Sequence, residues 1–135
     1  YYRATNYTKT LDILCEIQYT VGIGEHMTKQ EMLENTTLEL RRGVIVLAVL
    51  SQLDEPQYGY SLIKRLADGG LEIDQGTLYP LLRRLESQGL LSSDWRIEGE
   101  RPRRYYVLSD EGRALLPQLK EEWNGIVSML DRMLK

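Results

Sequence analysis

Residues 74–108 constrain the fold of this chain more than any other segment, because a helical period and a strand pattern follow one another there. Leucine recurs at the spacing i, i+3, i+4 and i+7, at positions Leu78, Leu81, Leu82 and Leu85. Asp74 suits the cap in front of such a helix, and Gly89 suits the left-handed residue that ends one. The first half of the segment therefore predicts an amphipathic helix over 74–88.

A two-stranded ribbon is expected directly after this helix. Residues 90–97 and 103–108 have the composition of strands, and the turn between them holds Gly99 and Pro102. Three arginines stand at or beside this turn: Arg101, Arg103 and Arg104. A helix that enters a groove, with a basic ribbon to grip the backbone, is how a winged helix holds duplex DNA.

The residues before 74 predict two more helices. Thr36 or Thr37 can cap the first, whose run 44–50 is apolar on every side, so we expect this helix to be central and buried. Its β-branched residues would also allow a strand, but the length and the upstream cap favour a helix. The second helix is expected over 58–68, and residues 71–73 then form a short strand.

The predicted fold class is mainly α with a small β-wing, a winged helix-turn-helix plus a C-terminal dimerisation helix. Ser109 caps the last helix. We expect an N-terminal extension over 1–35, a winged-helix DNA-binding domain over 36–108 and the dimerisation helix over 109–135.

Residues 1–26 differ from the rest, being rich in Thr and Tyr. A short helix is possible where Ile13, Ile17 and Val21 recur every four residues, and His26-Met27 resembles a cloning junction before a native start. We interpret 1–26 as a cloning-derived or variable extension; the alternative is a genuine arm packed on the domain.

Composition argues against several classes of protein. The single cysteine, Cys15, excludes an internal disulfide, and with the single histidine, His26, it leaves no metal quartet. We find no paired nucleophile and base and no phosphate loop, so neither an enzyme nor a cofactor is expected. No apolar run is long enough to span a bilayer and no signal peptide is evident, so a cytoplasmic location is expected.

The outward face of the predicted helix 74–88 carries the candidate DNA-reading side chains. Arginine can fork onto guanine, and hydroxyl and amide groups can bind phosphates or base edges. Pro80 breaks a local rule inside a helix, which is a hint of function. The candidate DNA-binding residues on this helix are Gln75, Thr77, Tyr79, Pro80, Arg83 and Arg84, joined by the three wing arginines.

The plainer interpretation is an amphipathic helix and a hairpin whose arginines are merely solvated, and Glu98 and Glu100 at the tip support it. The net charge of −3 and the pI of 5.3 also leave open a winged helix that binds proteins rather than DNA. Local clustering of charge matters more than the total, so duplex DNA remains the favoured partner.

The last helix carries a narrow apolar stripe with a period of 3.5, the seam of a helix pair. Its residues are Leu116, Leu119, Trp123, Ile126, Leu130 and Met133. The simplest partner is the same helix of a second subunit, giving a two-fold homodimer that would bind a palindromic operator. Two Trp123 rings near the dimer axis, with Ile126 and Val127, could line a slot for a flat ligand; the alternative is that Trp123 is packed core.

Three pieces of sequence together resemble the PadR family of bacterial transcription regulators. They are Tyr58-Gly59-Tyr60-Ser61-Leu62-Ile63, then Gly76-Thr77-Leu78-Tyr79-Pro80-Leu81-Leu82-Arg83-Arg84-Leu85-Glu86, and Arg101-Pro102-Arg103-Arg104-Tyr105-Tyr106-Val107-Leu108-Ser109-Asp110-Glu111-Gly112. The chain is similar to the short subfamily, with one C-terminal dimerisation helix and, in multidrug-sensing members, a tryptophan as at Trp123. The resemblance implies a dimeric repressor that leaves its operator when a small aromatic or lipophilic effector binds. Residues 1–26 have no counterpart in it, and Pro117 and Gly125 depart from an even dimer helix.

Overall fold

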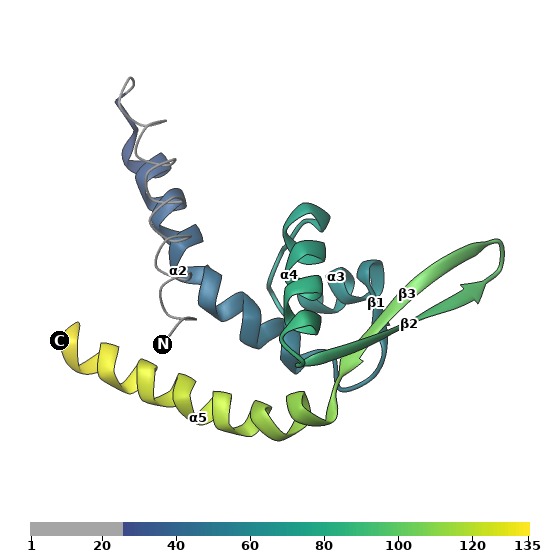
Figure 1. Ribbon diagram of the computed structural model, residues 1–135. Coiled ribbons are helices and arrows are strands. Elements are labelled where there is room, and N and C mark those ends of the chain that lie inside the picture. Colours follow the sequence, from purple (N-terminus) through teal and green to yellow (C-terminus); the bar gives the residue numbers. More distant parts are fainter. Residues whose placement is uncertain (1–25) are drawn as a thin grey trace. The chain divides into compact units, whose positions relative to one another are not determined.

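The computed structural model describes residues 26–135, so Cys15 and the short helix expected around Ile17 lie outside the described residues. Its elements are α2 (Lys29–Ser51), β1 (Gln57–Tyr58), α3 (Gly59–Asp68), α4 (Gln75–Ser87), β2 (Leu91–Glu98), β3 (Arg101–Leu108) and α5 (Asp110–Met133) (Figure 1). The chain divides into two units, Tyr1–Leu40 and Arg41–Lys135. The second unit holds every element from β1 onward, and the predicted fold class, mainly helical with a small β-wing, is confirmed.

The three strands form an antiparallel sheet in the order β1-β3-β2. β2 and β3 pair along their whole length, from Leu91 opposite Leu108 to Glu98 opposite Arg101, and they project beyond the helices as the wing (Figure 1). β1 pairs only with the base of β3, since Gln57 lies opposite Tyr106 and Tyr58 opposite Tyr105. The outer part of the wing is therefore a two-stranded ribbon.

The short strand expected at 71–73 is wrong, because that segment closes the end of α3 instead. Gly70 has a positive φ of 97°, and the Leu71 N–H donates to the Leu66 carbonyl at 2.8 Å. This is the six-to-one bond of a helix C-terminus that ends in a left-handed residue. Residues 71–73 therefore belong to no strand, and the strand that completes the sheet is β1 (Gln57–Tyr58).

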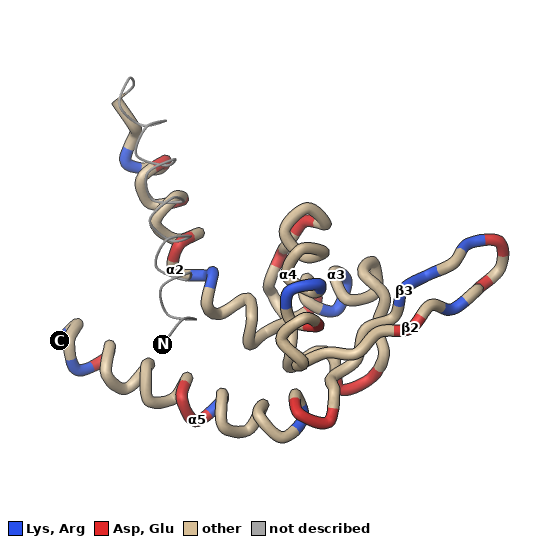
Figure 2. The backbone as a smooth tube through the Cα atoms, in the orientation of Figure 1, with Lys and Arg blue, Asp and Glu red and all other residues tan. Residues whose placement is uncertain are grey.

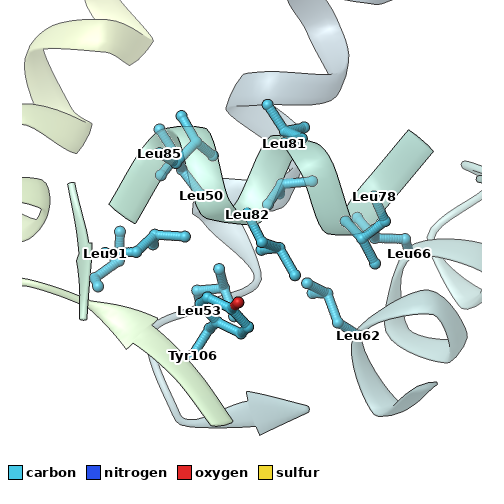
Figure 3. Packing of buried hydrophobic residues seen from close by; sticks show 12 residues of the cluster. Leu50, Leu53, Leu62, Leu66, Leu78, Leu81, Leu82, Leu85, Leu91 and Tyr106 are labelled. Carbon is cyan, nitrogen blue, oxygen red and sulfur yellow. The ribbon is translucent and has the colours of Figure 1, made fainter. Parts of the chain in front are cut away.

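The core centres on the inner face of α4, whose four leucines are buried as predicted. Leu62 and Leu66 of α3 meet this face from one side, and Leu50, Leu53, Leu91 and Tyr106 complete it (Figure 3). Full burial of an aliphatic side chain of this size contributes about 1.5–3 kcal/mol. The orientation of α4 is thus fixed by its buried stripe, and the opposite face is left free for a ligand.

The first helix begins earlier than predicted. Thr28, rather than Thr36 or Thr37, caps it: the Thr28 Oγ1 accepts from the Glu31 N–H at 3.1 Å, and Glu31 Oε2 accepts from the Thr28 N–H at 3.2 Å. This reciprocal pair is a capping box. The Thr36 hydroxyl instead donates to the Met32 carbonyl at 2.8 Å, inside the helix.

The expected burial of the run 44–50 on every side is also wrong. Only Val49 and Leu50 of α2 are buried, and residues 44–48 are half-buried. The reason is that the core covers one side of the helix here. The other side of an apolar run is left facing outward, where a further surface could cover it.

The wing strands differ from prediction at their outer ends. β3 starts at Arg101, so Pro102 lies in the strand opposite Ile97, and the turn is Gly99-Glu100. Proline is tolerated in a strand where its missing N–H faces an open edge. Because β1 pairs only at the base of β3, the strand has such an open edge at Pro102.

The joint between the sheet and α5 is tightly bonded. As predicted, Ser109 caps α5: its Oγ accepts from the Gly112 N–H at 3.0 Å, and it also donates to the Gly89 carbonyl at 2.6 Å. Gly112 packs against the Leu90 carbonyl so closely that a side chain would collide with it. Arg113 donates to the Asp54 carbonyl at 2.8 Å. Among the residues from 26 to 135, no helix has the length and hydropathy to cross a membrane.

Candidate nucleic-acid interface

α4 begins at a well-formed cap and presents a polar face. Asp74 accepts from the Thr77 N–H at 3.0 Å, and hydrogen bonds from Thr77 lower the pKa of this carboxyl. Gly89 has a φ of 87°, a conformation that strains any residue with a side chain, and it turns the chain from α4 into β2. The helix is therefore defined at both ends, as the sequence predicted.

Five of the six candidate residues on α4 are exposed: Gln75, Thr77, Pro80, Arg83 and Arg84. Pro80 has no N–H, so the usual helical hydrogen bond to the carbonyl four residues before it is missing. The sixth candidate, Tyr79, is half-buried, and its ring lies against Gly59 at the start of α3. A Cβ at position 59 would overlap that ring, so glycine there leaves the space that the Tyr79 ring occupies.

A cleft of about 420 Å³ lies between α4 and the wing. Its walls come from β1, the first residue of α3, α4 and both wing strands. They are Tyr58, Gly59, Tyr79, Arg83, Trp95, Pro102, Arg103, Arg104 and Tyr106. Aromatic rings and guanidinium groups together suit a phosphate with its sugar, since the rings offer apolar surface and the arginines offer charge.

The structure separates the three wing arginines that the sequence grouped together. Arg101 is exposed beside the turn. Arg103 is half-buried: its guanidinium lies 4.5 Å from the centre of the Tyr58 ring and 3.4 Å from Glu98. Arg104 faces α4, where it donates to Glu86 at 2.7 Å. The pleat explains the difference, because residues 103 and 104 point to opposite faces of β3.

The outer face of the sheet is an arginine–tyrosine stack. The Tyr58 and Tyr105 rings lie 5.5 Å apart, and Arg96, held 3.2 Å from Asp94, covers the Tyr105 ring at 4.5 Å. The Tyr105 hydroxyl donates to Glu98 at 2.6 Å, and this bond raises the pKa of Tyr105. These contacts stiffen the wing. They also pair two of its arginines, Arg96 and Arg103, with carboxylates.

The other arginines of α4 and the wing define where an anion can bind. Arg83, Arg84 and Arg101 form no ion pair with any residue between 26 and 135. Figure 2 shows positive segments on α4 and on both wing strands, with negative segments near the tip. A polyanion can therefore approach along α4 and the cleft, while the tip itself is of mixed charge.

The predicted dimer and effector residues lie on α5. Leu116 and Leu119 pack against the core, whereas Trp123 and Ile126 are 37% and 44% exposed. The exposed part of the stripe continues through Leu130 and Met133. Val127 is half-buried beside them. Within the described part of the chain, no group of His, Cys, Asp or Glu residues is placed to hold a metal ion.

Sequence reasoning missed part of the cleft. Tyr106 is a core residue, where burial raises its pKa, and it also forms a wall of the cleft, a role that the sequence did not indicate. Tyr58, Gly59 and Trp95 were not singled out for the site at all. The alternation of β2 would have helped, because Trp95 stands opposite Arg104 and must share its face.

An exposed helix set beside a basic β-ribbon, on a small helical core, defines a winged helix-turn-helix regulator. Comparison with known proteins agrees. Residues 46–118 match the model of the transcriptional regulator PadR-like family. The transcriptional regulator Rv3488 of Mycobacterium tuberculosis is 38% identical over 81 residues, which cover 59% of this chain and 76% of that protein.

Solved structures give the same answer. A PadR family transcriptional regulator from Eggerthella lenta has 48% identity and a TM-score of 0.75, over 78% of this chain and 95% of that one. A transcriptional regulator from Clostridium thermocellum has 30% identity and a TM-score of 0.65, over 72% and 99% of the two chains. The chain belongs to the PadR-like family of transcriptional regulators, which are not enzymes, and the resemblance seen in the sequence is confirmed.

Proposed function

We propose that this regulator acts as a homodimeric repressor that binds a palindromic operator in the cytoplasm and leaves it when a small aromatic or lipophilic effector binds. The observation that carries the DNA-binding part is the cleft between α4 and the wing, beside arginines of α4 that form no ion pair with any described residue. α4 would lie in the major groove, with Gln75, Thr77, Arg83 and Arg84 toward the bases and phosphates. One backbone strand would pass through the cleft, between Tyr79 and Arg103.

Dimerisation is supported by apolar surface that one chain leaves uncovered. The α5 stripe from Trp123 to Met133 is exposed, and the run 44–48 of α2 is only half-buried. A second α5 would cover the stripe and set the spacing of two α4 helices. Half-sites would then be about 34–36 Å apart, or a multiple of that distance.

Effector binding is supported by the position of Trp123. Its ring is partly exposed in the middle of the stripe, beside Ile126 and Val127. Two such rings across a dimer axis could hold a flat compound. A compound that favours one spacing of the α4 helices would change operator affinity, typically by about 1–3 kcal/mol of coupling.

The base-reading role of α4 predicts a specific mutant contrast. Arg83→Ala should weaken operator binding by about 1–3 kcal/mol and relax the sequence preference, since a bidentate contact to guanine is lost. Arg101→Ala should instead weaken specific and random DNA alike and reduce the salt slope by about 1, since one phosphate contact is lost. Fluorescence anisotropy with operator and scrambled duplexes over a range of salt measures both quantities. Equal losses on both duplexes for Arg83→Ala would remove it from the base contacts.

The wild-type protein also separates DNA binding from the alternative, a winged helix that binds proteins. Random-sequence DNA should be retained at low salt and released as salt rises, because counterion release drives the non-specific mode. Indifference to DNA at low salt would favour a protein partner, for which the exposed Trp95 and Ile97 of the wing offer apolar surface.

The effector site predicts quenching of tryptophan fluorescence by flat aromatic dyes. Trp95 contributes to the same signal, so the control is Trp123→Ala, which keeps Trp95 and removes the proposed site. Dye affinity should be lost in that variant and unchanged in Trp95→Ala. Dye binding that survives Trp123→Ala would place the ligand elsewhere.

A further inference from the structure

Arg104 joins the wing to α4 just outside the apolar core. The inner face of the sheet is closed by Leu91, Leu108 and Tyr106, and the next pair outward on that face is Trp95 with Arg104. From this position the Arg104 Nη2 donates to Glu86 Oε1 of α4 at 2.7 Å, and the Nε donates to the Ser93 hydroxyl of β2 at 3.0 Å. One side chain thus bonds to both neighbouring elements.

The surroundings make this contact stronger than a surface ion pair. The Arg104 and Glu86 side chains are 35% and 27% exposed, and the guanidinium lies 5.3 Å from the centre of the Tyr106 ring and 5.9 Å from that of Trp95. The second Glu86 oxygen is buried and has no hydrogen-bond partner among the described residues. A carboxylate partly removed from water is stabilised by the cation bonded to it, and loss of that cation leaves the charge uncompensated.

We propose that Glu86, Ser93 and Arg104 form a brace that fixes the angle between the wing and α4, and that Arg104 is a positioning residue rather than a phosphate contact. The proposal rests on the DNA-binding function proposed above. Beyond the brace the wing extends from Asp94 to Glu98, roughly 17 Å at about 3.3 Å per residue, so a tilt of about 10° at the brace would move the tip by roughly 3 Å. A displacement of that size exceeds the tolerance of a binding site.

Removal of the negative charge at Glu86 distinguishes the brace from general repulsion of phosphate, because the two explanations predict opposite changes in DNA affinity. Glu86→Ala should weaken binding of operator DNA about tenfold, because the wing loses its fixed angle. Glu100→Ala, at the tip, removes an equal charge from a residue outside the brace and should tighten binding about twofold, because one repulsion from phosphate is gone. Glu86→Gln keeps a hydrogen-bond acceptor and should fall between wild type and Glu86→Ala. Tighter binding by both Glu86 variants would overturn the brace.

A second substitution tests Arg104 directly. Arg104→Lys keeps the charge but cannot hold Glu86 and Ser93 together in a planar fork. It should weaken binding about as much as Glu86→Ala while leaving the salt slope unchanged, and Ser93→Ala, which alters no charge, should act in the same direction. Full affinity in Arg104→Lys, or a salt slope reduced by about 1 in Arg104→Gln, would make Arg104 a phosphate contact instead.

A readout without DNA makes failure of the brace distinguishable from failure of the proposed function. In a Trp123→Tyr background, Trp95 is the only tryptophan, and it lies against Arg104. Glu86→Ala should shift the Trp95 emission and lower its anisotropy, with the far-UV circular dichroism retained, whereas Glu100→Ala should leave both unchanged. Unaltered Trp95 signals in Glu86→Ala would reject the brace, whereas wild-type protein that ignores DNA at low salt would reject the DNA-binding function alone.

Discussion

Ile126→Asp is expected to lower operator affinity by about two to four orders of magnitude while leaving each winged helix folded. Ile126 is exposed in the single chain and lies mid-stripe on α5, where a second copy would bury it. A buried carboxylate without a partner is costly, so the helix pair should separate. Two linked half-site contacts then become one, and the gain from effective concentration, about 10²–10⁴, is lost.

Sedimentation and anisotropy measure this prediction together. Ile126→Asp should sediment with the mass of one chain at concentrations where wild type sediments as two, and its far-UV circular dichroism should stay close to that of wild type. The matched control is Ser128→Asp, which adds the same charge to an exposed position of α5 outside the stripe. A variant that stays dimeric, or a monomer with full operator affinity, would contradict the proposed assembly.

Leu82→Ala is expected to destabilise the fold by about 2–5 kcal/mol, the range for removing a buried leucine side chain. Leu82 is fully buried between α3, the end of α2 and the sheet (Figure 3). The cavity would lie directly under α4, and its closely packed lining has little freedom to collapse. In a domain of this size the melting temperature should fall by well over 5 °C.

Thermal unfolding followed by circular dichroism gives the comparison, at one fixed protein concentration because a dimer's stability depends on it. Leu115→Ala is the control: it is the same substitution at a position 39% exposed on α5, outside the stripe, and should cost far less. Equal losses in the two variants would mean that α4 does not rest on the core described here.

Local chemistry explains why the sequence predicts α4 and its neighbours so well. Asp74, Gly89 and Ser109 each act within a few residues along the chain, and the stripe from Leu78 to Leu85 needs only the helical period. The capping box at Thr28 and Glu31 was equally readable from its spacing. It places the start of α2 inside the segment 1–35 that the sequence predicts to be an extension.

Contacts between distant residues explain what was missed. Arg101, Arg103 and Arg104 are neighbours in sequence, but the strand pleat and the pairing with β2 send them to different surroundings. The strand at Tyr58 exists only because β3 pairs with it, and a two-residue strand has no period of its own. The cleft combines both effects, so its aromatic walls could not be assigned from spacing alone.

The bonded joint at Ser109 has a mechanical consequence for signalling. One hydroxyl connects the loop after α4 to the first turn of α5, and Arg113 adds a connection to Asp54. Because this joint is stiff, a rotation of α5 would carry α4 with it as one rigid body, and neither helix would unfold. In the proposed dimer, an effector bound between the two α5 helices would then change the distance between the two α4 helices. Each subunit alone would still bind its half of the operator as before.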